Sequence, residues 1–145
     1  MSVPKDEAPQ QVMELIAAAM AQDVHRTATI IERIGTGATP QLMYGVCSAI
    51  AEVGAHFLRE LGMTPDREAG DLVQMQELVP GAMDDSPAST WGLRFLVATA
   101  NGDHAMTLAL FSASLDEGGA RHLDDLSALL SSVASLGRTV VKATP

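Results

Sequence analysis

The chain has 145 residues, of which 47% are hydrophobic, and it carries a formal net charge of −9 at pH 7. This length and apolar content predict one domain with a core of its own. The nine basic residues are scattered and aromatic residues make up 3% of the chain, so we expect no binding of nucleic acid. No apolar stretch reaches membrane-spanning length and the N-terminal residues lack a secretion signal, which predicts a cytoplasmic protein without membrane contact.

Helical periodicity and capping residues predict three helices in the first part of the chain. Asp23 is placed to cap the second helix, which Gly35 ends. Thr39 followed by Pro40 predicts the start of the third helix, because proline is favoured at the first helical position. The three predicted helices cover residues 8–21, 24–34 and 40–61.

The middle of the chain, residues 63–85, has a different composition. It contains prolines and glycines that interrupt regular structure, and residues 80–85 are the best linker candidate. Residues 72–79 fit either a short helix or an extended segment. We therefore predict an irregular, linker-like segment here, and leave both alternatives open for 72–79.

The last part of the chain again predicts three helices. Ser86 and Pro87 open the first of them, and Asp103 caps the second. Gly137 is expected to end the last helix and leave residues 138–145 as a frayed tail. The three predicted helices cover residues 86–100, 104–114 and 120–136.

An internal echo relates these two parts. The apolar pattern of residues 11–34 reappears in residues 91–114, offset by 80 positions, and residues beyond the second helix match at an offset of 83. Asp23 and Asp103 occupy the same place in this alignment, which predicts equivalent helix caps. We therefore predict an all-α, compact bundle of about six helices made of two related three-helix units. The predicted divisions are a single domain over 1–145, sub-units over 8–62 and 86–137, and a linker-like segment over 63–85.

The spacing of Glu52, His56 and Glu60 is the best candidate for a metal site. Residues four apart share one face of a helix, and carboxylate and imidazole groups are suitable ligands for transition metals. The same pattern is common on solvated helix faces, and the echo positions rebuild no such set. We expect no resident metal or other cofactor, and name these three residues as the candidates if a metal binds.

No catalytic constellation stands out from the remaining reactive residues. His25 and His104 adjoin the two capping aspartates, whose carboxylates we expect to be occupied by backbone N–H groups. His122 is expected to be a solvated residue of a first helical turn. Cys47, the single cysteine, lies in an apolar helical pattern and is predicted to be a buried core residue.

We therefore predict a non-catalytic, cytoplasmic protein that acts in protein–protein interaction or regulation. The binding surface is expected to be an apolar, Met-containing helix face with an acidic rim that steers a basic partner, since methionine adapts to varied surfaces. Self-association into a homo-oligomer is a second expectation. The alternative is a helical bundle that binds a metal or small ligand through Glu52, His56 and Glu60. The candidate partner-binding residues are Met43, Val46, Met75, Met83 and Trp91.

Overall fold

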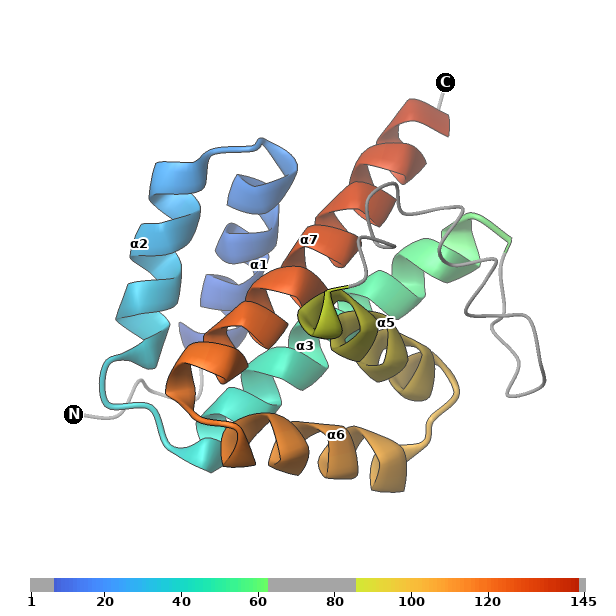
Figure 1. Ribbon diagram of the computed structural model, residues 1–145. Coiled ribbons are helices and arrows are strands. Elements are labelled where there is room, and N and C mark those ends of the chain that lie inside the picture. The colour runs from blue at the N-terminus through green and yellow to red at the C-terminus, as the bar shows by residue number, and fades with distance from the viewer. Residues whose placement is uncertain (1–6, 63–85, 144–145) are drawn as a thin grey trace.

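The computed structural model describes residues 7–62 and 86–143, which form six α-helices and no strand (Figure 1). The predicted all-α bundle is therefore confirmed. Residues 1–6, 63–85 and 144–145 lie outside the described residues, and with them the predicted linker-like segment. The helices are α1 (Glu7–Met20), α2 (Val24–Gly35), α3 (Pro40–Glu60), α5 (Pro87–Ala100), α6 (His104–Asp116) and α7 (Gly119–Ala143).

The predicted helix caps are present. The Thr39 hydroxyl accepts the N–H of Leu42 at 3.1 Å, and the Ser86 hydroxyl accepts the N–H of Ser89 at 3.3 Å. In both cases a proline follows the cap at the start of the helix. These bonds satisfy backbone donors that a helix start otherwise leaves unpaired.

The two Asp-capped turns have the same geometry. Asp23 and Asp103 each accept the N–H three residues later at 3.1 Å. The N–H of each aspartate donates to the carbonyl five residues earlier, at 3.0 and 2.9 Å. The residues before them, Gln22 and Gly102, adopt left-handed φ values of 59° and 68°. The predicted equivalence of the caps therefore holds locally, whereas the common origin of the two complete units stays a prediction.

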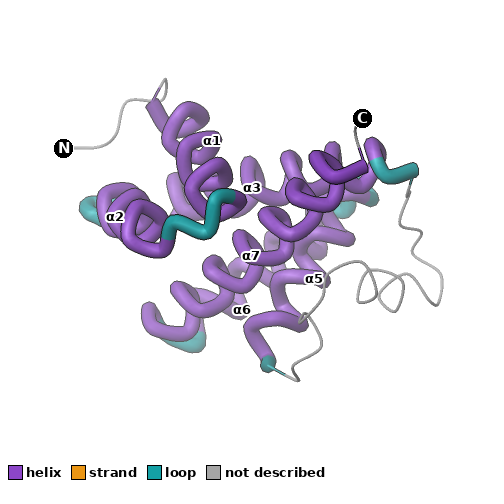
Figure 2. Tube along the Cα trace, turned by 90° about the horizontal axis from the view of Figure 1, so that it is seen from above, coloured by secondary structure: helices purple, strands orange, loops and turns teal. Residues whose placement is uncertain are grey.

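The centre of the bundle is formed by α3, α5 and α7, which pack against one another (Figure 2). A Cβ atom added to Gly92 of α5 would lie 3.0 Å from the backbone nitrogen of Leu129 in α7. A Cβ added to Gly54 of α3 would lie 2.7 Å from Leu96 and 2.8 Å from Val133. Glycine at these positions lets the three central helices approach closely. The α1–α2 hairpin lies against one side of this centre, and α6 covers α5 and α7.

The prediction that the last helix stops at Gly137 is wrong, because α7 continues to Ala143. A Cβ at Gly137 would lie 2.7 Å from the sulfur of Met20 and 2.9 Å from the ring of Phe57. This glycine therefore allows a close approach to α1 and α3 inside the helix. The next residue, Arg138, donates to the carbonyls of Ala19 and Met20 at 3.2 and 3.4 Å, which ties the final turns of α7 to the end of α1.

Small residues of α3, which could otherwise let a second copy of the chain pack closely, are used inside the chain. Ala51, Gly54 and Ala55 are buried, and Gly54 contacts side chains of α5 and α7. This face gives no support to a homo-oligomer. In the described part of the chain, no helix is both long and apolar enough to cross a membrane.

Replacing Gly92 with alanine should destabilise the bundle, because the new methyl group meets the backbone of α7. Overpacking costs about 1–3 kcal/mol, against about 1 kcal/mol gained in helix propensity. We expect a net loss of about 1 kcal/mol in the free energy of unfolding, measured by urea denaturation. The matched control is Gly45→Ala, also in a helix interior but with no atom within 4 Å of the added Cβ. It should gain up to about 1 kcal/mol, and a Gly92→Ala variant as stable as this control would contradict the packing argument.

Candidate functional site

The predicted metal candidates lie on an exposed stripe of α3. His56 Nε2 is 3.6 Å from Glu60 Oε1, and these side chains are 57% and 54% exposed. Glu52, one turn earlier, is also exposed. Within residues 7–62 and 86–143, no three His, Cys, Asp or Glu residues are grouped so as to hold a metal ion. The pattern is that of a solvated helix face.

The candidate partner-binding residues do not form one exposed surface. Val46 and Trp91 are core residues, 3% and 6% exposed, and Met43 is half-buried against the core. The indole N–H of Trp91 donates to the carbonyl of Leu110 at 2.8 Å, so even its polar edge is used internally. Met75 and Met83 lie outside the described residues. The apolar helix faces that predicted a binding surface instead pack into the core.

Cys47 is buried as predicted, with no exposed surface. Burial raises the pKa of its thiol to about 12, and the negative charge of Asp125 adds to the shift. A thiol in this state is not a nucleophile at neutral pH. The histidines beside the capping aspartates are likewise unsupported as catalysts, because each carboxylate binds a backbone N–H.

The structure brings together a polar cluster in which Ser114, His122 and Asp125 are buried and Arg121 is partly exposed. The Ser114 hydroxyl lies 2.9 Å from His122 Nδ1 and donates to Asp125 Oδ2 at 2.7 Å. Arg121 Nε donates to Asp125 Oδ1 at 2.9 Å. The prediction that His122 is solvated is wrong, since it is 5% exposed and its ring meets Phe111 edge to face. Arg121 and His122 lie four and three residues before Asp125, so helical spacing alone was a signal that each of them is a neighbour of Asp125 on the helix surface.

This cluster holds α6 to α7 and does not have the connectivity of a catalytic triad. The single hydroxyl proton of Ser114 goes to Asp125, so His122 Nδ1 is assigned as the donor to Ser114. His122 Nε2 is then an acceptor, and it is buried with no partner among the described residues. A nucleophilic serine would need a histidine nitrogen to take its proton and access for a substrate, but Ser114 is 2% exposed.

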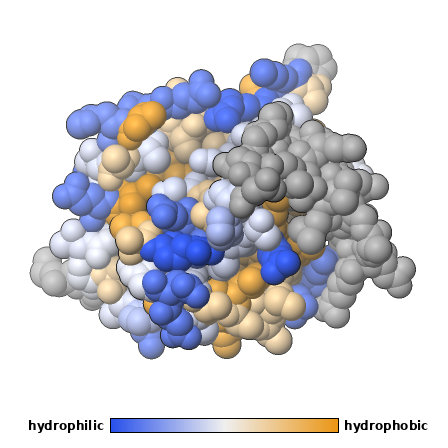
Figure 3. Space-filling view, in the orientation of Figure 1, coloured by the Kyte–Doolittle hydropathy of each residue, from blue (hydrophilic) through white to orange (hydrophobic). Residues whose placement is uncertain are grey.

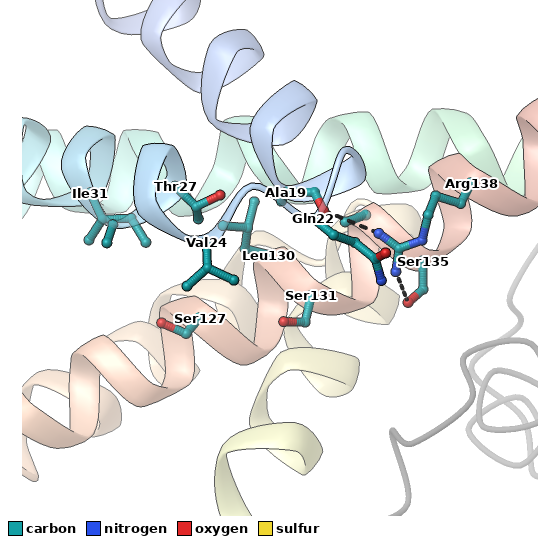
Figure 4. A pocket seen from close by; sticks show the side chains of 12 residues that line it. Ala19, Gln22, Val24, Thr27, Ile31, Ser127, Leu130, Ser131, Ser135 and Arg138 are labelled. Carbon is teal, nitrogen blue, oxygen red and sulfur yellow. Dashed lines mark hydrogen bonds between the residues drawn. The ribbon is translucent and has the colours of Figure 1, made fainter.

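An open groove lies between α2 and α7. It has a volume of about 460 Å³ and continues past the end of α1 (Figure 4). Leu130 and Ala134 of α7 form a buried apolar floor, and Ile31 of α2 lines one wall. Arg138 closes one end and is the charged residue of the described lining. Figure 3 shows apolar surface where Figure 1 places α2 and α7. The other lining residues are Ala19, Gln22, Val24, Thr27, Ala28, Ser127, Ser131 and Ser135.

A second, much smaller cavity lies at the matching place between α6 and α3. Its volume is about 40 Å³. Nine described residues line this cavity. Seven of them align, in the internal echo, with residues that line the groove, and we call such aligned residues echo partners. The offset is 80 where the groove residue lies in α1, in α2 or between them, and 83 where it lies in α7. The groove and the small cavity therefore stand in equivalent positions of the two predicted units.

The difference between the two places centres on one aromatic side chain. Tyr44 of α3 reaches across the small cavity, where its hydroxyl lies 2.8 Å from Thr107 Oγ1 and its ring meets Phe111 edge to face. The echo partner of Tyr44 is Ser127, whose side chain is too short to cross to α2. The groove is thus open where its counterpart is closed.

A second apolar hollow lies between α5 and α6 and contains Met106, Val97 and Leu110. It has a volume of about 410 Å³. Its echo place between α1 and α2 is lined by charged residues, among them Glu14 and Arg26. Met106 thus places one methionine in this hollow, on a different helix from the predicted partner-binding residues.

Comparison of the chain with protein-family models, curated proteins and solved structures finds no match.

Acidification should weaken the fold through His122. Burial holds the pKa of this imidazole below its ordinary value of 6.5, although the charge of Asp125 opposes the shift. As pH falls below about 6.5, the unfolded chain binds a proton that the folded chain resists, so stability present above that pH is lost. The free energy of unfolding should fall by up to about 1.4 kcal/mol per pH unit from this group.

Urea unfolding at several pH values between about 7.5 and 5 measures this effect. A His122→Phe variant should lose stability less steeply than the wild type as pH falls. The control is His56→Phe, which removes an exposed histidine and leaves the buried cluster intact. A His122→Phe variant with the wild-type pH dependence would show that His122 is not the group responsible.

Proposed function

We propose that this chain is a non-catalytic, cytoplasmic binding protein that holds an apolar segment of a partner protein in the α2–α7 groove. The observation that carries the proposal is the contrast between the two equivalent places in the bundle. One is closed by the chain's own Tyr44, and the other is left open with about 460 Å³ and an apolar floor.

The construction of α2 supports a binding role for this groove. Its buried residues, Ile30 and Ile34, belong to the flank that packs against α1. Val24, Ala28 and Ile31 follow at helical spacing on the flank that lines the groove, and Val24 is 79% exposed. A partner that covered these three side chains would remove apolar surface from water, which stabilises a complex.

The polar groups of the groove suit a peptide partner. Ser127, Ser131 and Ser135 lie at successive turns of α7 and offer hydroxyl groups along one wall. An apolar floor with a few convergent polar groups is the usual composition of a binding site.

The charge of the whole chain favours a basic partner. A net charge of −9 attracts cationic proteins at long range and raises the rate of encounter. The predicted acidic rim does not belong to the described lining of the groove, where the charged residue is Arg138. We therefore assign the acidic residues to steering, and the contact itself to the apolar floor.

The alternative of a metal-binding bundle receives no support from the exposed positions of Glu52, His56 and Glu60. The buried Ser114, His122 and Asp125 cluster likewise does not favour an enzyme, because its nucleophile is inaccessible.

A charge placed in the groove should abolish partner binding. The chain is immobilised, exposed to an extract of its source organism, and the retained proteins are quantified by mass spectrometry. Ala28→Glu puts a carboxylate on the groove wall, and Ala109→Glu puts one on an exposed position of α6 as the matched control. We expect a set of proteins retained by the wild type and the control and lost, by about tenfold or more, with Ala28→Glu.

Two results would count against the proposal. One is a retained set that is identical for all three proteins, which would place binding elsewhere. The other is a set lost with both variants, which would point to general charge effects. Circular dichroism of each variant confirms that the helices are intact.

A further inference from the structure

We infer that the α2–α7 groove recognises a tyrosine side chain presented by a basic segment of the partner protein. This inference rests on the proposed function and names the group that the groove selects. The template for it is inside the molecule, because Tyr44 already fills the equivalent place between α3 and α6.

The hydrogen-bonding groups needed for a phenol are present in the groove. In the closed half, the Thr107 hydroxyl donates to the carbonyl of His104 at 3.0 Å, so it is left to accept the hydroxyl proton of Tyr44. In the open half, the echo partner Thr27 donates its hydroxyl to the carbonyl of Asp23 at 2.8 Å. Thr27 Oγ1 therefore also has lone pairs free to accept, and it lines the groove.

An apolar surface for the ring is present as well. In the closed half, the Tyr44 ring packs on Phe111, with centroids 5.3 Å apart. The echo partner of Phe111 is Ile31, which is half-buried on the groove wall next to Thr27 (Figure 4). A phenol ring can thus lie against Ile31 while its hydroxyl reaches Thr27, as Tyr44 lies against Phe111 and reaches Thr107.

The charge of the chain favours a phenol that is carried by a protein segment. An acidic chain with a net charge of −9 attracts a cationic segment, whereas a neutral phenol in solution gains nothing from that field. We therefore commit to tyrosine within a basic protein segment.

A double-mutant cycle between peptide and protein tests this inference. The probes are two 15-residue peptides of alanine and lysine with one central tyrosine or phenylalanine, titrated into the full chain and followed by NMR. With the wild type, the tyrosine peptide should bind about 3- to 10-fold more tightly, as expected for one neutral hydrogen bond. Thr27→Val should remove that preference.

The matched control is Thr29→Val. Thr29 also donates its hydroxyl to a backbone carbonyl of α2, at 2.9 Å, and it does not line this groove. This variant should keep the preference for tyrosine, and the largest shifts in the wild type should fall on Ile31 and Thr27. A third arm titrates 4-ethylphenol and ethylbenzene, which separates free phenols from a peptide-borne ring.

Each outcome decides something. Equal binding of the two peptides, or a tyrosine preference that survives Thr27→Val, overturns the tyrosine inference while leaving the groove as a partner site. No binding of either peptide also overturns it. Tighter binding of 4-ethylphenol than of the tyrosine peptide replaces a partner protein with a small phenol. Failure of the proposed function is seen separately, in the capture experiment with Ala28→Glu.

Discussion

The close approach of α3, α5 and α7 is the constraint on which the rest of the molecule depends. At Gly92 the α5 helix meets the backbone of α7, and at Gly54 the α3 helix meets side chains of both others. A side chain at either position would push the central helices apart. Gly137 allows the same close approach where α7 passes α1 and α3. This approach lets Arg138 donate hydrogen bonds to the last carbonyls of α1. The close packing of the centre therefore also sets where the α1–α2 hairpin lies and how wide the groove beside it is.

The two halves share packing and differ in the cavities they leave. Each half has an Asp-capped turn of the same geometry, and each has a hollow between its second helix and the long helix of the other half. Tyr44 closes the hollow in one half, and Ser127 leaves it open in the other. The hollows beside the short helices differ too, since one is lined mainly by charged residues and the other has Met106 and apolar neighbours together with Arg94 and Asp103. The two halves thus share a frame and differ in the cavities that it leaves.

The helix caps could be predicted from the sequence, because they depend on residues close together in the chain. The caps at Asp23, Thr39, Ser86 and Asp103 were predictable because a capping side chain and its backbone partner are three residues apart. The end of α7 was not predictable, because Gly137 could equally mark a helix stop or a close approach, and only tertiary neighbours distinguish them.

The site was harder to predict than the fold, again for physical reasons. Val46 and Trp91 were candidates for a binding face, yet the same apolar periodicity serves a core face, and burial decides between the two. The burial of His122 could not be predicted from the sequence alone, because it depends on the side chains that α6 packs against this residue. The groove was implicit in the echo, since comparing Tyr44 with Ser127 at the offset of 83 reveals the missing aromatic ring. That comparison acquires meaning only when the structure shows Tyr44 crossing to Thr107.

The most direct test of the account is a crystal structure of the Ser127→Tyr variant, which restores to α7 the side chain that α3 carries at the equivalent place. The account predicts that the introduced ring crosses the groove, lies against Ile31 and brings its hydroxyl within hydrogen-bonding distance, about 2.8 Å, of Thr27 Oγ1. An introduced ring that points into solvent, with the groove unchanged, would show that the two places are not equivalent and would contradict the central claim.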